Sequence, residues 1–299
     1  MRISGILRWV VFSNFFYGIS VLALQWQTAI VLSLPFAGFW FYLAAFSATL
    51  LYYSHAYLFD TSTKAADERM QWYRRYAIGV RVSQGMLTFF LLFATWHLLP
   101  GLFPASASSL WPAISFPLLA ALYYGGFQPG KAPFNLRKYG WLKPIIIAVV
   151  WSGIGSLIPE WWAAASHHHP YVPSSLAMLL FLQQGLFVLA LSILFDVKDY
   201  AADHNLQIKT WAIRVGPGQL LRRIIFPLAI LGVIAETYPC LTAGYPPYHA
   251  LLNTIPWVLL IFASQSLKKN RSVVHYLWVI DGLIPLKAGI GIIAHLLIN

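Results

Sequence analysis

Apolar residues fill the chain in long blocks, and short groups of polar, charged and turn-forming residues separate these blocks. A helix that crosses the hydrocarbon core of a membrane needs about 20 predominantly apolar residues. Blocks of this length recur along the whole sequence, and the residues between them mark where each helix should end. The pattern therefore predicts nine helices, at residues 9–25, 36–59, 78–99, 109–126, 141–162, 174–196, 219–237, 247–266 and 276–297.

Composition supports a membrane protein and excludes two common alternatives. Hydrophobic residues make up 59% of the 299 positions and charged residues only 10%, whereas soluble domains carry about 25% charged residues. The formal net charge of +11 is typical of nucleic-acid-binding proteins, but the apolar blocks leave no soluble domain to present a basic face. We expect an all-α integral membrane protein that binds no nucleic acid.

Basic residues lie on one side of the predicted helices. They precede the first helix, follow the second, and occupy the later connections on the same side, and Lys287 inside the last helix is the exception. Loops that are rich in Lys and Arg face the cytoplasm, so this side and the N-terminus should be cytoplasmic. We expect a protein of the cytoplasmic, or inner, membrane whose polar loops and functional site lie on the cytoplasmic side.

The sequence is predicted to form one transmembrane domain over residues 1–299. It can be divided into two four-helix halves, about 1–126 and 141–266, followed by a last helix at 276–297. Only the hydropathy and an acidic residue at the end of the second and sixth helices repeat between these halves. Cys240 is the single cysteine, so no intramolecular disulfide can support the fold.

Three of the nine acidic residues lie close together at the predicted end of the sixth helix. Asp196, Asp199 and Asp203 form the pattern D-x-x-D-x-x-x-D, and these spacings place all three on one face of a helix. Their mutual repulsion favours a bound cation. Mg²⁺ fits best, because it binds through one or two carboxylates together with substrate phosphates. The alternative is a solvated helix end whose carboxylates pair with Lys198, Lys209 and Arg214.

The sequence DVKDYAADHNLQIKTWAIRVG, residues 196–216, resembles the second aspartate-rich motif of the UbiA superfamily of intramembrane polyprenyl transferases. In that motif the three acids are followed, in the same register, by a basic residue, a Thr and a final Gly. The family usually has Gly where this chain has Gln207. The matching residues are Asp196, Asp199, Asp203, Ile208, Lys209, Thr210, Arg214 and Gly216.

The resemblance implies a helical bundle with a central cavity that opens to the bilayer. It implies that a polyprenyl diphosphate binds through Mg²⁺ to two aspartate motifs, and that the prenyl chain passes to a lipophilic acceptor, commonly an aromatic ring. Asp196, Asp199 and Asp203 would then be catalytic residues that hold the metal, with Lys209 assisting at the diphosphate.

The first aspartate motif of the family, N-x-x-x-D-x-x-x-D at the end of the second helix, is only partly present. Aligning Asp60 with its middle acid puts Ala56 at the Asn and Lys64 at the last Asp, and a register based on Asp67 does not restore the motif. Asp60 remains a candidate metal ligand and catalytic residue, and Lys64 could neutralise a phosphate in place of a lost Mg²⁺. The alternative is that this half binds no metal.

Two further basic residues are candidates for the diphosphate site. Arg69 follows the first acidic loop and Lys143 follows the fourth predicted helix, so each could clamp a diphosphate through charged donors. The alternative for both is that they set the topology and contact anionic lipids. Asp281, inside the last helix, is a candidate by its position in the membrane, although a structural role for it and for Lys287 is favoured.

The predicted function is Mg²⁺-dependent transfer of an isoprenoid chain from a polyprenyl diphosphate to a lipophilic, aromatic acceptor in the membrane. One alternative is a UbiA-like protein that binds a lipid or isoprenoid without transferring it. A small-solute transporter is a second alternative. It is disfavoured because the charged residues gather at one membrane face, whereas transporter sites lie near the midplane.

Overall fold

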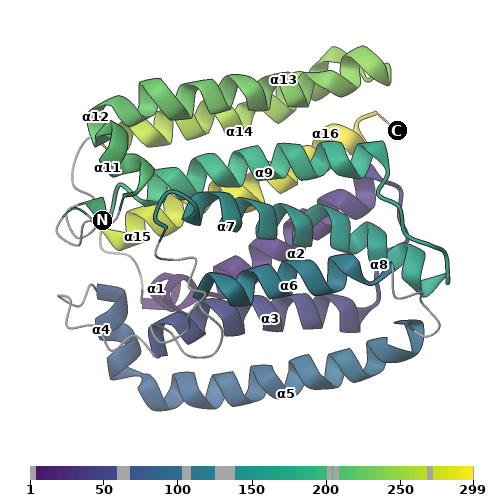
Figure 1. Ribbon diagram of the computed structural model, residues 1–299, viewed down its shortest axis with the longest axis horizontal. Helices are drawn as coiled ribbons and strands as arrows, with labels where there is room; N and C mark the ends of the chain where they lie inside the picture. The colour runs from purple at the N-terminus through teal and green to yellow at the C-terminus, as the bar shows by residue number, and fades with distance from the viewer. Residues whose placement is uncertain are drawn as a thin grey trace.

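Helices account for the regular structure of the computed structural model. It describes residues 5–58, 68–102, 109–124, 139–200, 204, 209–267 and 272–298, and these residues contain no strand. The long helices run side by side along the longest axis of the molecule (Figure 1). The predicted all-helical class is therefore confirmed for the described part of the chain.

The first half of the chain contains one break and one helix that the hydropathy did not predict. The first predicted helix is divided at Asn14, whose φ of 68° is left-handed. A short polar helix, α4, lies between two long apolar ones. In chain order the helices are α1 (Gly5–Phe12), α2 (Phe15–Val31), α3 (Phe39–Leu58), α4 (Glu68–Arg75), α5 (Ala77–Leu102) and α6 (Trp111–Tyr124).

The second half consists of long helical segments, three of which contain a π-helical turn. The helices before the acidic motif are α7 (Lys143–Ser152), η3 (Gly153–Leu157), α8 (Ile158–Ser166) and α9 (Ser175–Phe195). Those after it are α11 (Trp211–Val215), α12 (Pro217–Leu220), η4 (Leu221–Ile225), α13 (Phe226–Thr242), α14 (Pro247–Ser266), α15 (Val273–His275), η5 (Tyr276–Ile280) and α16 (Leu283–Leu296).

Apolar helical segments of membrane-spanning length make this an integral membrane protein. Within the described ranges, five segments are long and apolar enough to cross a bilayer: Ala77–Leu102, Lys143–Ser166, Ser175–Phe195, Pro217–Thr242 and Val273–Leu296. Each of the nine predicted ranges contains helical structure. Nine crossings and a cytoplasmic N-terminus stay predictions.

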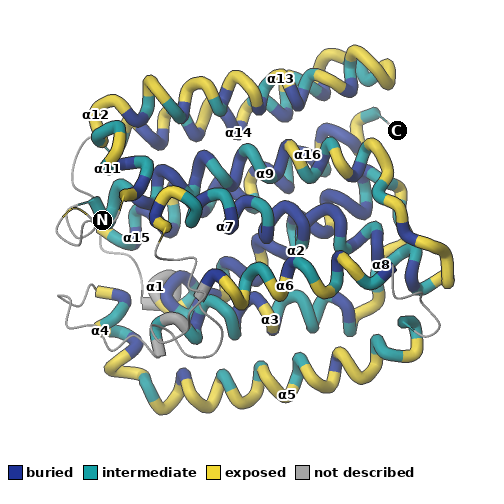
Figure 2. Tube along the Cα trace, viewed as in Figure 1, coloured by how far each residue is buried: buried dark blue, intermediate teal, exposed yellow. Residues whose placement is uncertain are grey.

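The core of the bundle lies around α9, and the helices at its edge expose apolar faces. Figure 2 shows buried residues concentrated in the central helices and exposed residues along α5 and α13. Phe187 of α9 packs edge-on against Trp257 of α14, with ring centroids 5.0 Å apart, and Trp257 is 0% exposed. Exposed apolar faces suit helices that are surrounded by lipid, because lipid tails are as apolar as the side chains.

The close approach of α13 to α14 depends on a glycine. A Cβ atom at Gly232 would lie 2.0 Å from the ring of Trp257. Small residues at helix interfaces allow backbones to approach closely in membranes. Since Trp257 is fully buried, its ring has little freedom to move away from an added side chain.

We expect Gly232→Ala to destabilise the bundle by about 1–3 kcal/mol, which is typical of overpacking in a filled core. Thermal unfolding of the purified protein in detergent would measure the loss. Gly289→Ala is the matched control, because a Cβ at Gly289 meets nothing within 4 Å. Equal thermal stability of the two variants would contradict this account of the interface.

Candidate functional site

The end of α9 carries the first residue of the acidic motif, and this residue is buried. Asp196 caps α9, and its side chain is 0% exposed. Its Oδ1 accepts a hydrogen bond from Lys143 Nζ at 2.6 Å. Lys143 begins α7, so the packing of α7 against α9 brings together two predicted site residues that are 53 positions apart.

The ion pair uses only one oxygen of the Asp196 carboxylate. The second oxygen, Oδ2, is buried and has no hydrogen-bond partner among the described residues. Burial raises the pKa of the Asp196 carboxyl above its ordinary value, while Lys143 acts in the opposite direction. A buried carboxylate oxygen is costly unless a donor or cation satisfies it. This oxygen therefore fits a metal ion or a donor group on a substrate.

Asp199 lies beside Asp196, in a turn and not in a continuation of α9. The backbone N–H groups of Val197, Lys198 and Asp199 each donate to the carbonyl three residues earlier. Such turns have about three residues per turn, so positions i and i+3 are eclipsed. The prediction of one α-helical face is corrected, but Asp196 and Asp199 still share a side. Asp199 is 41% exposed and pairs with Lys198 at 3.5 Å.

The segment after the acidic motif is anchored to the start of α7. Thr210 caps α11, because its Oγ1 accepts a hydrogen bond from the backbone N–H of Ile213. Trp211 Nε1 donates to the carbonyl of Trp141 at 2.7 Å, two residues before Lys143. Lys209 is exposed and forms no hydrogen bond or ion pair with another described residue. The structure thus brings Lys143, and not Lys209, onto Asp196.

Arg69 lies in a different place, within a polar cluster of the first half. Its side chain is 2% exposed. Its Nη2 donates to Asn14 Oδ1 and its Nη1 to the hydroxyl of Tyr57 at 3.1 Å. Asn14 Nδ2 in turn donates to Ser54 Oγ and to the hydroxyl of Tyr73, at 3.0 and 2.8 Å. Arg69 therefore joins α4 to α3 and to the start of α2, and its contact with a diphosphate stays a prediction.

A neighbouring aromatic cluster was missed by the sequence reasoning. The hydroxyl of Tyr17 donates to Asp281 Oδ2 at 2.7 Å, and the Tyr17 ring stacks on Tyr53 with centroids 4.3 Å apart. Trp151 Nε1 donates to the hydroxyl of Tyr53 at 2.7 Å. In the sequence Tyr17 is an ordinary aromatic residue in an apolar block. The signal that could have found the cluster is Asp281, an acid inside a predicted span.

Three predicted site residues lie outside the described residues. They are Asp60, Lys64 and Asp203. Among the residues that are described, no group of three or more His, Cys, Asp or Glu side chains could hold a metal ion. Asp196 Oδ2 and Asp199 remain as two carboxylate donors, which suits Mg²⁺ because it needs only one or two carboxylates besides substrate phosphates and water.

Comparison with known proteins finds relatives in structure only. No protein-family model and no curated protein matches the sequence. A UbiA homologue from Archaeoglobus fulgidus bound to Cd²⁺ superposes with a TM-score of 0.54 and 14% identity, over 95% of this chain and 98% of that one. Another structure of a UbiA homologue from the same organism superposes with a TM-score of 0.54 and 14% identity, over 96% of this chain and 98% of that one.

A digeranylgeranylglyceryl phosphate synthase superposes with a TM-score of 0.50 and 16% identity, over 98% of this chain and 95% of that one. At such low identity the likeness concerns the fold alone. It spans nearly the whole of each chain, and it agrees with the resemblance that the motif after α9 indicates. The protein therefore has the fold of the UbiA superfamily.

Proposed function

We propose that this protein transfers an isoprenoid chain from a polyprenyl diphosphate to a lipophilic, aromatic acceptor in the membrane, with Mg²⁺ as cofactor. The observation that carries the proposal is the buried Oδ2 of Asp196, which has no hydrogen-bond partner among the described residues and lies near Asp199 and Lys143 at the end of an apolar helix. Structures of the same fold include one bound to Cd²⁺ and a synthase of a digeranylgeranylglyceryl phosphate. Both support the proposal.

Asp196 and Asp199 would hold the metal, and Asp203 and Asp60 complete the proposed set of ligands. Mg²⁺ in this position would neutralise the diphosphate so that it can leave from the allylic carbon of the chain. The carboxylates are suited to this role because one is held rigidly by Lys143 and the other is exposed to an incoming substrate. We place the site on the cytoplasmic side of the membrane.

Lys143 has a second role in this proposal. Its side chain is 25% exposed although its Nζ is paired with Asp196. An ammonium group carries three donors, so Lys143 can hold Asp196 in place and also donate to a phosphate oxygen. Lys209, Lys64 and Arg69 are proposed as further contacts of the diphosphate.

The aromatic cluster supplies a surface for the reacting carbon. The stacked rings of Tyr17 and Tyr53 lie next to Trp151, inside the bundle. Aromatic faces attract cations, and their attraction is stronger where water is excluded. We propose that these rings stabilise the allylic cation that forms as the diphosphate leaves.

Asp199→Asn tests the transferase proposal. We expect consumption of radiolabelled polyprenyl diphosphate to fall about a hundredfold or more, because a preorganised charge at the reacting group is lost. The variant should keep the thermal stability of the parent, since the Asp199 side chain is partly exposed and its distance to Lys198 is 3.5 Å. The assay uses purified protein in detergent with Mg²⁺ and a panel of aromatic acceptors.

Glu160→Gln is the matched control for that variant. Glu160 accepts hydrogen bonds from Tyr171 and from the backbone of Ser174 before the start of α9, at the end opposite Asp196. We expect its activity to be unchanged. Wild-type turnover by Asp199→Asn, or equal loss in both variants, would overturn the assigned role of Asp199.

A second candidate function is isoprenoid diphosphate binding without transfer or metal. Two observations favour it. Lys143 already neutralises one oxygen of Asp196, and the described residues offer no group of three ligands for an ion. In this case Lys143 would contact the diphosphate directly.

Chelation separates the two functions. If the protein only binds, affinity for a polyprenyl diphosphate should survive excess EDTA. Lys143→Met should then lower it roughly 10- to 150-fold, the equivalent of one lost hydrogen bond to a charged group. Arg222→Met, which removes an exposed charge at the start of the α13 segment, is the control and should not change the affinity. Loss of all binding in EDTA would support the metal-dependent transferase instead.

A further inference from the structure

Asp281 is a buried carboxylate inside the last apolar segment, Val273–Leu296, and it has no part in the proposed metal site. It is 8% exposed. Its Oδ2 accepts a hydrogen bond from the hydroxyl of Tyr17 at 2.7 Å, and it forms no ion pair with another described residue. Ionisable residues inside membrane spans are rare and are functional candidates by default.

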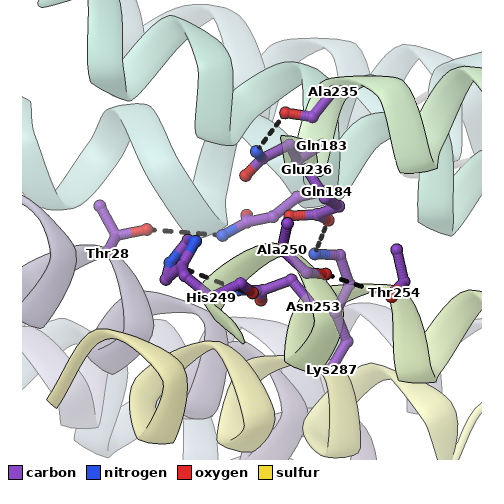
Figure 3. A network of polar contacts seen from close by, with 10 residues as sticks. All are labelled: Thr28, Gln183, Gln184, Ala235, Glu236, His249, Ala250, Asn253, Thr254 and Lys287. Carbon is purple, nitrogen blue, oxygen red and sulfur yellow. Dashed lines mark hydrogen bonds and ion pairs between the residues drawn. The ribbon is translucent and has the colours of Figure 1, made fainter. Parts of the chain in front are cut away.

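The other buried acids of the described chain each have a lysine in contact. They are Asp196, paired with Lys143, and Glu236, paired with Lys287. Figure 3 shows Lys287 of α16 reaching Glu236 of α13. A buried anionic group without a contacting cation is costly. Asp281 differs from the other two because only a hydroxyl donor touches it.

Two cations act on Asp281 through space, without contact. They are Lys198 and Arg69. Lys198 pairs with Asp199 of the acidic motif at 3.5 Å, and Arg69 is one of the proposed contacts of the diphosphate. Asp281 therefore lies within electrostatic range of the proposed site. A bound diphosphate would oppose the charges of both cations, so the negative charge of Asp281 would remain for a cation that forms nearby.

The hydroxyl that Asp281 accepts belongs to one of two stacked rings. The centroids of Tyr17 and Tyr53 lie 4.3 Å apart, and the rings are inclined by 18°. Trp151 Nε1 donates to the hydroxyl of Tyr53 at 2.7 Å. Each hydroxyl is thus held by a different partner. Hydrogen bonds polarise the groups that they join, so a phenol that donates to a carboxylate has a more electron-rich ring, which attracts cations more strongly.

We propose that Asp281 is a positioning residue for the cationic end of the prenyl chain, an inference that rests on the proposed transfer. It holds the ring of Tyr17 against Tyr53 and supplies negative charge to the stacked pair. As the carbon–oxygen bond of the donor breaks, its electron pair leaves with the diphosphate and the allylic carbon becomes positive. The acceptor then gives an electron pair to the new bond and passes one proton to the diphosphate. Asp281 stays ionised throughout.

Charged and neutral analogues of the chain test the cation site without turnover. Farnesylamine is an allylic amine that is cationic at neutral pH, and farnesol is its neutral counterpart. With Mg²⁺ and inorganic diphosphate present, we expect the wild type to bind farnesylamine about tenfold or more tightly than farnesol, because opposite charges attract strongly where water is scarce. Isothermal titration calorimetry in detergent measures both affinities. Equal affinities would overturn the proposal.

Asp281→Asn isolates the charge, because the amide keeps an oxygen that can accept the hydroxyl of Tyr17. We expect its affinity for farnesylamine to fall about tenfold or more and its affinity for farnesol to stay unchanged. If Asp281 had a structural role only, thermal stability would fall and both ligands would weaken alike. That result would overturn the proposal.

Glu160→Gln is the matched control for this variant. Glu160 also accepts a hydrogen bond from a tyrosine hydroxyl, that of Tyr171 at 3.1 Å, and it lies in another apolar segment. Its affinity for farnesylamine should equal that of the wild type. An equal loss in Glu160→Gln and Asp281→Asn would assign the effect to something other than Asp281 and would overturn the inference.

Transfer kinetics separate this role from that of the metal site. In Asp281→Asn we expect kcat to fall about tenfold or more while KM for the polyprenyl diphosphate is unchanged, since the charge acts on a cation that forms after binding. An unchanged kcat would contradict the role of Asp281. If the wild type consumes no donor, the transferase proposal fails, whereas the affinities for farnesylamine and farnesol still decide whether Asp281 supports a cation site.

Discussion

An unpaired charge is costly in the hydrocarbon core of a membrane, and this cost governs where the charged side chains of the bundle lie. Lys143 is paired with Asp196, and Lys287 is paired with Glu236. The distance between the ammonium nitrogen and the carboxylate oxygen is 2.6 Å in each pair. Asp281 accepts the hydroxyl of Tyr17, and Arg69 is held by Asn14 and two tyrosine rings. The polar chemistry of the protein is therefore concentrated in a few clusters between otherwise apolar helices.

The two ion pairs differ in how exposed their lysine side chains are. Lys143 is 25% exposed, whereas Lys287 is 1% exposed. The first pair lies at the end of α9, where the Lys143 side chain is partly exposed and Oδ2 of Asp196 is buried. The second pair lies within the spans, beside a cavity that Glu236 lines, and both of its side chains are buried. The same kind of interaction thus occurs at two different depths in the bundle.

Hydropathy predicted helix positions well, because the apolar length of a segment is a local property. The helix predicted at 247–266 has the same bounds as α14. The break at Asn14 was not predictable, since it depends on Arg69, Ser54 and Tyr73, which lie far along the chain. Hydropathy did not predict helix α4, because most of its residues are polar. The spacing of Asp196 and Asp199 identified the candidate site, although the turn that carries them is tighter than a helix.

The sequence by itself determined the membrane-embedded helical class, the positions of the long helices and the two acidic residues at the end of α9. Tertiary structure alone decided which cation meets which carboxylate. Lys143 and not Lys209 pairs with Asp196, and Lys287 pairs with Glu236. These partners lie 53 and 51 positions apart, and helix packing brings them together, so no pattern within a single segment records the pairing.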